Sequence, residues 1–238
     1  FNVERWNLID TSLLDIPPVW EFYGLEDARI VKWDDKLYWT GVRRDVKPDG
    51  QGRMELSRLD NVYNEVERFR IEAPIHKDSY CEKNWMIIED MPFHYVKWAN
   101  PTEVVKADIT TLQSQQIIHK EGIGELQNMR GSSQVIRYGD YRMCIIHETA
   151  LWKNKIDQRN AKYTHRFVVW DLDWNIKYIS ESFSFMDGEI EFCCGMTFHN
   201  NGDLLISFAF QDNAAFIVRV PENVVDEMIK EALDYAVN

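Results

Sequence analysis

Short runs in which apolar and polar residues alternate fill most of the chain, and this period of two predicts β-strands. The first series is interrupted at the turn-forming stretches DD, KPDGQG and NVYNE. Its runs cover residues 28–33, 36–44, 53–60 and 67–74. Three comparable series follow, beginning near residues 84, 132 and 192. Only residues 221–237 have helical spacing, with Pro221 near the start and one apolar stripe formed by Val225, Met228, Ile229 and Leu233.

Each series contains about four predicted strands and opens with a polar cluster followed by an apolar strand. The series repeat at roughly 50 to 60 residues, a period typical of β-propeller blades. A β-sandwich is the alternative, but it does not require polar clusters at the same point of each unit. We therefore predict an all-β chain that forms a single β-propeller domain over residues 1–238, with a short C-terminal helix.

The polar clusters are the candidate functional site, because the innermost strands of propeller blades all start at one face around the central channel. The clusters should therefore line one funnel. They comprise Glu26, Asp27 and Arg29; Glu82, Lys83 and Asn84; Arg130, Ser132 and Ser133; and Glu189 and Glu191. For any single cluster, the alternative is an ordinary set of polar residues at the start of a strand.

Composition narrows the classes of function. An apolar content of 45% with nine Trp, ten Tyr and twelve Phe is typical of a globular protein. The net charge of -12 argues against nucleic acid or an anionic membrane as partner. No apolar run reaches the ~20 residues of a membrane-spanning helix. We expect no signal peptide and a cytoplasmic location, although the chain begins with Phe1, which leaves room for sequence upstream.

Cysteine and histidine spacing predicts neither a disulfide framework nor a metal site. The four cysteines lack CxxC spacing, and Cys193 and Cys194 are adjacent in an apolar run, which indicates buried, reduced thiols. The six histidines form no HxH or HxxxH pair. We therefore expect no metal and no cofactor.

A family resemblance is visible in the stretch GLEDARI, residues 24–30. It is similar to the Glu-Asp-Pro-Arg motif of glycoside hydrolase family 130, five-bladed propeller enzymes that cleave or phosphorolyse β-mannosides. The stretches EKNW, RGSSQVI, HRFVVWD and EIEFCCGMTFHNNGDLLISFAFQD resemble propeller modules related to that family, some of which are attached to glycosyltransferases. The resemblance spans Gly24 to Val220 and implies five blades. A β-mannosyltransferase family is built on the same propeller.

The chain departs from the family pattern in three ways. Ala28 stands where the motif has proline, a position that stiffens the backbone without taking part in chemistry. The stretch FHYVKWANP contains no arginine, although phosphorylases of the family hold phosphate with paired arginines, and this argues against phosphorolysis. Four blades are visible, so a fifth must come from residues 1–23, from closure by the C-terminal segment, or from upstream sequence.

The resemblance implies that Asp27 is the acid that protonates the leaving oxygen, directly or through a sugar hydroxyl. Strict alternation would place Asp27 and Arg29 on one face of the strand and Glu26 on the other. Arg29 would then clamp substrate oxygens or anchor a second carboxylate; the alternative is a structural Asp27–Arg29 pair. Glycosyl transfer to water also needs a base or nucleophile. Glu191 is the preferred second carboxylate, because it opens the fourth series, and Glu148 is the other candidate.

Residues suited to hydroxyl or anion recognition complete the predicted site. Lys83 and Asn84 form one set, and Tyr163, His165 and Arg166 form another. Trp85 adjoins a cluster and could stack on the C–H face of a sugar ring. The remaining substrate-binding candidates are Glu26, Arg29, Arg130, Ser132, Ser133 and His147.

The leading function is therefore a glycosidase-like enzyme that cleaves a mannoside-type bond by carboxylate acid–base chemistry, with a carbohydrate as its partner. A glycosyltransferase or glycoside phosphorylase on the same scaffold is the first alternative. A non-catalytic carbohydrate-binding propeller module associated with a glycosyltransferase is the second. An enzyme needs a second carboxylate across the sugar from Asp27, whereas a binding module does not. The sugar, its linkage and the oligomeric state stay open.

Overall fold

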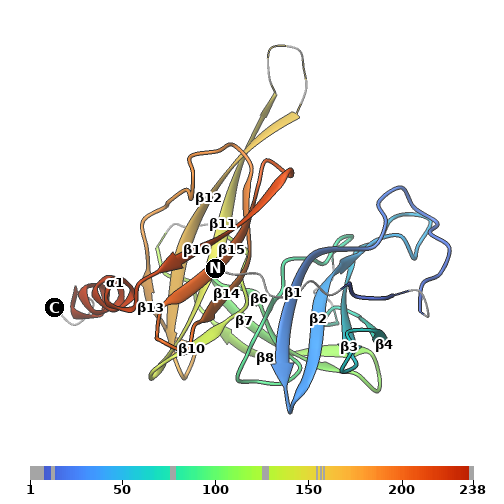
Figure 1. The fold of residues 1–238 in the computed structure, drawn as a ribbon, viewed down its shortest axis with the longest axis horizontal. Helices are drawn as coiled ribbons and strands as arrows, with labels where there is room; N and C mark the ends of the chain where they lie inside the picture. Colours follow the sequence, from blue (N-terminus) through green and yellow to red (C-terminus); the bar gives the residue numbers. More distant parts are fainter. Residues whose placement is uncertain are drawn as a thin grey trace. The chain divides into compact units, whose positions relative to one another are not determined.

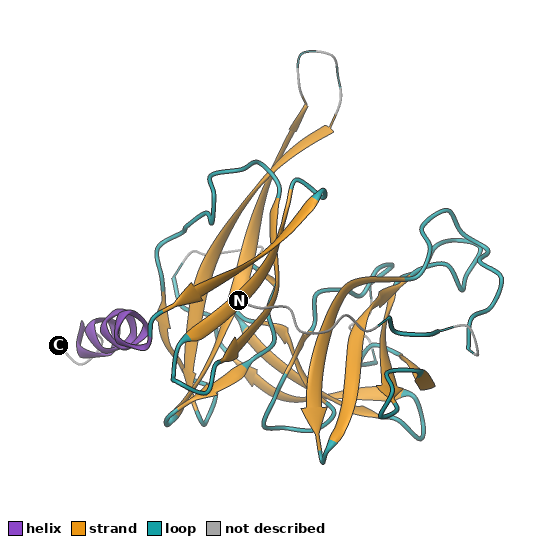
Figure 2. Ribbon diagram, in the orientation of Figure 1, coloured by secondary structure: helices purple, strands orange, loops and turns teal. Residues whose placement is uncertain are grey.

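The computed structural model describes residues 8–11, 14–75, 79–124, 129–153, 155, 157 and 159–235. Strands form nearly all of the regular structure, and one helix lies at the C-terminal end (Figure 2). The chain divides into two compact units. The first comprises Phe1–Lys83 and Lys106–Gln115, and the second comprises Asn84–Val105 and Gln116–Asn238. The expectation of a single domain over residues 1–238 stays a prediction.

The first unit contains an antiparallel sheet whose strands are neighbours in chain order (Figure 1). Its strands are β1 (Leu25–Trp33), β2 (Lys36–Arg43), β3 (Arg53–Leu59) and β4 (Glu65–Ile71). Trp33 pairs with Lys36 across the two-residue turn Asp34–Asp35. Both turn residues have positive φ, 46° and 60°, the geometry that twists a tight hairpin correctly and that aspartate tolerates. The predicted DD turn is therefore confirmed.

A second sheet follows the same chain-order pattern. Its strands are β5 (Met86–Ile87), β6 (His94–Trp98), β7 (Thr102–Asp108) and β8 (Gln113–Lys120). The hairpin end of β7 and β8 belongs to the first unit. There the Leu112 carbonyl accepts the N–H of Glu72 at 2.9 Å, and the Ser114 hydroxyl donates to the Glu72 carbonyl at 2.6 Å.

The third and fourth sheets lie in the second unit. The third is built from β9 (Arg130–Gly131), β10 (Ile136–Tyr138), β11 (Tyr141–Lys153), β12 (Arg159–Asp171) and β13 (Ile176–Ile179). The fourth is built from β14 (Glu191–Phe198), β15 (Leu204–Phe210) and β16 (Ala214–Val220). Helix α1 (Glu222–Tyr235) follows directly.

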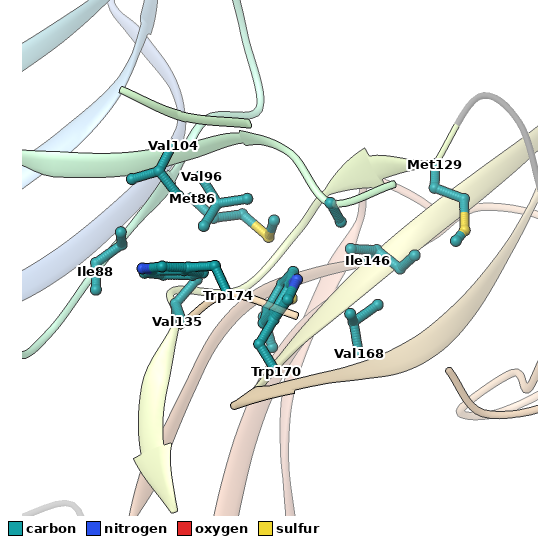
Figure 3. Packing of buried hydrophobic residues seen from close by; sticks show 12 residues of the cluster. Met86, Ile88, Val96, Val104, Met129, Val135, Ile146, Val168, Trp170 and Trp174 are labelled. Carbon is teal, nitrogen blue, oxygen red and sulfur yellow. The ribbon is translucent and has the colours of Figure 1, made fainter. Parts of the chain in front are cut away.

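Strand β11 shows how the third sheet separates two hydrophobic cores. Cys144 and Ile146 point into a cluster shared with the second sheet, which also contains Trp170 (Figure 3). The Trp170 indole N–H donates to Thr102 Oγ1 at 2.8 Å. Met143 and Ile145 point into a cluster shared with the fourth sheet and α1. Residues on one face of a strand recur every second position, so even-numbered and odd-numbered residues of the buried part of β11 face different cores.

Helix α1 confirms the predicted C-terminal helix. Its first N–H, that of Glu222, donates to Asp203 Oδ1 at 3.0 Å, which satisfies one of the donors that every helix leaves open at its start. Val225 and Ile229 are buried in the core shared with the fourth sheet, and Met228 packs against it. The Leu233 side chain and residues 236–238 lie outside the described residues.

The predicted all-β class is confirmed, and the expected number of five blades is wrong, because the described residues form four sheets. The described part of residues 8–23 adds no sheet. It contains only an isolated parallel bridge between Asp10 and Asn64. This stretch includes Pro17 and Pro18, which lack the N–H that a strand ladder needs. The C-terminal segment forms a helix instead of a strand.

All four cysteines lie among the described residues, and no disulfide joins them. Cys144 and Cys193 are buried, whereas Cys81 and Cys194 are only half-buried. Burial raises the pKa of the Cys144 thiol well above its ordinary value. No helix among the described residues has the length and apolar character needed to cross a membrane.

Candidate functional site

The start of β1 is the first part of the candidate site, and it departs from a regular strand. Glu26 pairs with Val42 and Arg29 with Thr40, so β1 contains one extra residue between these pairs. Asp27 lies in this bulge with a left-handed φ of 54°. The buried Arg29 donates from Nη1 to the Asp27 carbonyl at 2.7 Å. The expected strict alternation of Glu26, Asp27 and Arg29 is therefore wrong, because a bulge resets it.

The carboxyl group of Glu26 has a raised pKa. Burial is the main cause, the negative charge of Asp27 adds to it, and the positive charge of Lys83 opposes it. Lys83 is exposed, and Glu26 and Asp27 are half-buried. A carboxyl with a raised pKa holds its proton closer to neutral pH, which is the property that a general acid needs.

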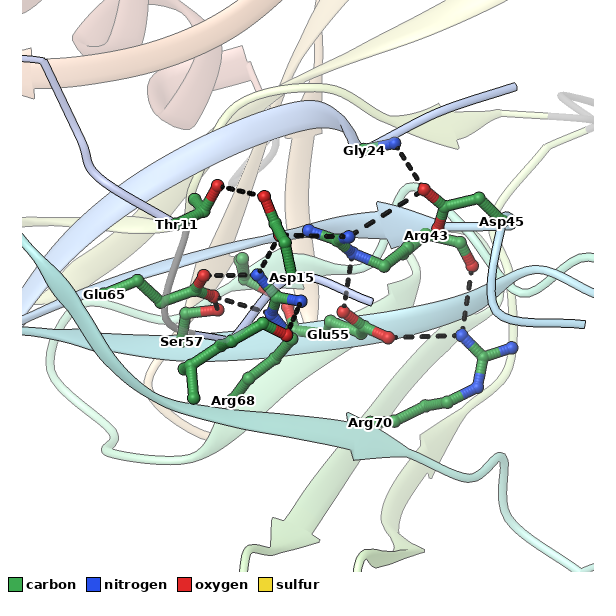
Figure 4. Close-up of polar contacts among 12 residues, drawn as sticks. Thr11, Asp15, Gly24, Arg43, Asp45, Glu55, Ser57, Glu65, Arg68 and Arg70 are labelled. Atoms are coloured by element: carbon green, nitrogen blue, oxygen red, sulfur yellow. Dashed lines mark hydrogen bonds and ion pairs between the residues drawn. The ribbon is translucent and has the colours of Figure 1, made fainter. Parts of the chain in front are cut away.

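Asp45 fixes the loop that leads into the bulge (Figure 4). Its Oδ2 accepts the N–H of Gly24 at 2.8 Å, and its main-chain carbonyl accepts the N–H of Val19 at 2.8 Å. Gly24 has a φ of +80°, which glycine adopts without strain. Asp45 is not among the residues predicted for the site, because nothing in its local pattern distinguishes it from a turn aspartate. Its buried position indicates that it holds the backbone just before Glu26 and Asp27.

A buried ionic network covers the face of the sheet beside this loop (Figure 4). Glu55 contacts Arg43 Nε at 3.0 Å and Arg70 Nη1 at 3.3 Å. Burial raises the pKa of Glu55, and the two arginines oppose that rise. Glu65 pairs with Arg68. These ion pairs join β2, β3 and β4 side by side, so the sheet that bears Asp27 is cross-linked by charge.

The start of the second sheet contains Asn84, which has a left-handed φ of 63° and is 6% exposed. Its Oδ1 has no hydrogen-bond partner among the described residues. Its carbonyl oxygen lies so close to Gly131 that a Cβ added there would come within 2.2 Å of it. Buried polar atoms are nearly always satisfied by protein, water or ligand. Asn84 therefore remains a candidate for ligand recognition.

The expectation for Trp85 is wrong. Its side chain is 1% exposed, with its ring centroid 5.9 Å from that of Tyr95 and the Lys97 ammonium 5.4 Å from its ring centre. A sugar cannot stack on a ring that is already enclosed. Lys97 is buried by the same contact.

His147 forms a second group with residues from neighbouring strands. Its Nδ1 lies 2.9 Å from Ser132 Oγ, and its ring centroid is 5.4 Å from that of Tyr163 and 5.1 Å from that of Phe192. Ser132 and His147 are buried, whereas Tyr163 is half-buried. The structure thus brings together three predicted residues, with Tyr163 the most accessible of them.

Ser133 is engaged in holding the backbone. Its hydroxyl donates to the Gln134 carbonyl at 2.8 Å and accepts the N–H of Ile145 at 2.8 Å. The neighbouring Arg130 is exposed on β9, opposite His147 in the register. Arg130 is therefore open to a ligand, whereas the Ser133 hydroxyl is used within the protein.

His165 pairs with His147 across β11 and β12 and is fully buried. Its Nε2 accepts the N–H of Cys193 at 3.4 Å, and its ring lies 4.9 Å from that of Phe185. Within the described part of the chain, its Nδ1 has no hydrogen-bond partner. Burial lowers the pKa of His165 to about 4, and the charge of Glu191 only partly opposes this. The imidazole is therefore neutral at physiological pH.

This burial predicts a loss of stability in acid. The unfolded chain binds a proton on His165 below its ordinary pKa of ~6.5, whereas the folded chain does so only near pH 4. Stability should therefore fall as pH drops through this window, by about 3 kcal/mol from this residue alone. Urea unfolding of the natural chain and His165→Phe at pH 7 and pH 4.5 measures the difference. An equal pH dependence in both proteins would contradict the prediction.

Glu148 and Arg166 occupy even-numbered positions of β11 and β12, whereas His147 occupies an odd-numbered one. They therefore lie on the opposite face of the third sheet from His147. Arg166 Nε lies 3.3 Å from Glu148 Oε2, and Arg166 Nη1 donates to the Ser180 carbonyl at 2.8 Å. The Tyr163 and Arg166 side chains, predicted as one set, therefore leave the sheet on different faces. Glu148 is partly exposed and held by an arginine.

Glu191, the preferred second carboxylate, is fully buried. Its Oε2 accepts the N–H of Phe185 at 2.6 Å, and its Oε1 accepts the N–H groups of Met186 at 2.9 Å and Gly188 at 2.6 Å. Three main-chain donors on one carboxylate fix the loop before β14. In this arrangement Glu191 holds the main chain of that loop in place.

The candidate residues are divided between the two units. Glu26, Asp27, Arg29, Glu82 and Lys83 belong to the first unit, and the other candidates belong to the second. Two cavities of about 500 Å³ and 490 Å³ lie elsewhere, one at the turns β1–β2 and β3–β4 and one beside Met91, Ile118 and Trp174. Among the described residues, no group of three or more histidine, cysteine or acidic side chains could hold a metal ion.

No protein-family model and no curated protein matches the chain. Solved structures do. A GDP-Man-dependent mannosyltransferase from Leishmania mexicana has a TM-score of 0.53 at 15% identity, covering 83% of this chain and 68% of that one. A provisionally assigned glycosidase from Bacteroides thetaiotaomicron has a TM-score of 0.56 at 11% identity, covering 82% and 66%. The fold is a β-propeller.

The described residues form four blades of this propeller, followed by one short helix. A mannose phosphorylase from Leishmania mexicana, in complex with phosphate ion, also matches at 12% identity over 92% of this chain and 88% of that one. Its TM-score of 0.42 is too low to support an argument. At such identities the likeness shows the fold alone, and the chain spans only about two thirds of the mannosyltransferase and the Bacteroides protein.

Proposed function

We propose that this propeller is a carbohydrate-active enzyme that acts on a mannoside-type glycosidic bond at the carboxyl pair Glu26–Asp27. One observation carries the proposal: Asp27 is held in a left-handed bulge at the start of β1, with its carbonyl bound by the buried Arg29. Strained residues and bulges are enriched at active sites, where they aim a side chain. The names of the two similar propellers, a mannosyltransferase and a provisionally assigned glycosidase, support a sugar substrate.

In this proposal Asp27 donates a proton to the leaving glycosidic oxygen as its bond to the anomeric carbon breaks. A water or sugar hydroxyl attacks that carbon, and the proton it releases restores the Asp27 carboxyl. Glu26, beside it, is a second carboxyl that burial keeps protonated to higher pH. Arg29 positions the backbone of Asp27 through the carbonyl contact. Gly24, held by Asp45, fixes the other side of the bulge.

The second carboxylate decides between hydrolysis and its alternatives. Glu191 binds three main-chain N–H groups, and Glu148 pairs with Arg166. Both candidates for the second carboxylate are therefore engaged, and this favours the second candidate function, a carbohydrate-binding propeller without hydrolytic activity. Lys97 is enclosed against Trp85, which argues against its holding phosphate.

The test combines turnover and binding. The protein is incubated with linear β-mannooligosaccharides in water, with added phosphate, and separately with a nucleotide-activated mannose and an acceptor. Release of reducing sugar supports hydrolysis, appearance of sugar phosphate supports phosphorolysis, and chain extension supports transfer. Binding heat without turnover supports the binding module. If neither turnover nor binding occurs with any of these sugars, the proposed function is wrong.

A further inference from the structure

The long hairpin of β11 and β12 carries a surface that the site above does not use. Its strands remain paired from His147 and His165 out to Lys153 and Arg159. In Figure 1 the paired ends extend beyond the other strands of the second unit. The outer part carries two large exposed side chains, Leu151 at 76% and Trp152 at 39%. Apolar side chains this exposed at the end of a hairpin contribute little to a core.

Parity shows which side chains share a face with Trp152. Even-numbered β11 and β12 residues point toward the core of the second sheet, as Ile146 and Val168 do. Continued outward, that face carries Glu148, Ala150, Trp152, Asn160, Lys162, Thr164 and Arg166. Leu151 occupies an odd-numbered position, so its side chain points to the opposite face of the hairpin from Trp152. The Glu148–Arg166 ion pair and Trp152 therefore lie on one continuous strip, about 13 Å apart along the strand.

The chemistry of the strip suits a sugar chain. Trp152 pairs directly with Asn160, whose Nδ2 donates to Glu189 Oε2 at 3.0 Å, and Lys162 Nζ lies 3.2 Å from Asp187. An exposed indole offers a flat face to pyranose C–H groups, and neighbouring amide and charged groups can bind hydroxyls. A single sugar ring is too short to contact both the ion pair and Trp152.

We propose that this strip is a binding subsite for a linear oligosaccharide, with Trp152 as the platform for one of its sugar rings. The inference rests on the proposed function, since it assumes a carbohydrate ligand. It adds a substrate class: chains of several sugars should bind better than single sugars, because only they reach from the ion pair to Trp152.

The test measures binding of mannose and of linear β-mannotetraose by calorimetry. All proteins carry Asp27→Asn as a common background so that turnover does not consume the ligand. Trp152→Ala should weaken tetraose binding by roughly threefold to tenfold, the range for loss of one aromatic contact, and leave mannose binding unchanged. Trp152→Phe, which keeps a ring, should retain most of the affinity. Leu151→Ala, one position along on the opposite face, should change neither.

The outcomes separate this inference from the proposed function. Unchanged tetraose affinity in Trp152→Ala overturns the subsite while leaving the proposed function intact. Equal losses in Trp152→Ala and Leu151→Ala overturn it as well, because they indicate general damage to the hairpin. If the Asp27→Asn parent binds neither mannose nor tetraose, the subsite is wrong. The proposed function is wrong as well only if the natural chain neither binds nor turns over any of the sugars in its own test.

Discussion

Replacing Asp27 with asparagine should lower turnover of a competent mannoside by about 10² to 10⁴, the usual contribution of general acid–base assistance. The melting temperature should change little. Asparagine keeps the size of the side chain and tolerates the left-handed φ of 54° at this position. It also leaves the main-chain carbonyl that Arg29 binds. The measurement is initial rates and thermal unfolding on the same purified variant.

Glu26→Gln is the matched control, because it alters the neighbouring carboxyl by the same chemistry. A larger loss in Glu26→Gln than in Asp27→Asn would assign the transferable proton to Glu26, whose pKa burial raises. Unchanged turnover in Asp27→Asn on a confirmed substrate would remove Asp27 from the mechanism. If the chain only binds sugar, Asp27→Asn should change affinity alone.

Replacing Glu191 with glutamine should destabilise the protein by about 2–4 kcal/mol. The carboxylate accepts three main-chain N–H groups in a fully buried position. A glutamine amide has only one oxygen, so its NH₂ group must face at least one of these donors. The unpaired donor loses its partner without gaining water, which is the costly case for buried hydrogen bonds. Urea unfolding followed by tryptophan fluorescence measures the loss.

Glu148→Gln provides the comparison for Glu191. Glu148 is partly exposed and makes one ion pair at 3.3 Å, so its replacement should cost no more than about 1 kcal/mol. A Glu191→Gln variant with native stability and abolished turnover would contradict the structural role, and it would restore Glu191 as the second carboxylate.

The sequence predicted most of the strands and turns because these depend on local chemistry. The runs at 36–44 and 53–60 differ from β2 and β3 by one residue each. The tight turn at Asp34–Asp35 follows from the tolerance of aspartate for positive φ. Helix α1 buries Val225 and Ile229, two members of the predicted stripe. Period and turn residues were sufficient for these elements.

The site was harder to predict, because its residues are defined by partners distant in sequence. The bulge at Asp27 depends on the pairing of β1 with β2, and no residue type in the run marks it. Trp85 is buried by Tyr95 and Lys97 from the next strand. The role of Glu191 depends on a loop that turns back to place three N–H groups around it. An apolar–polar pattern does not contain such information.

The left-handed backbone at Asp27 and Asn84 restricts which substitutions evolution can accept there. Both residues begin a sheet, and both have φ values, 54° and 63°, that only glycine, asparagine and aspartate adopt readily. A lineage that lost the chemistry at position 27 should therefore drift to asparagine or glycine, and seldom to glutamate, although glutamate keeps the charge. Among related sequences, those with aspartate at position 27 keep the carboxyl group, whereas those with asparagine or glycine keep only the backbone conformation.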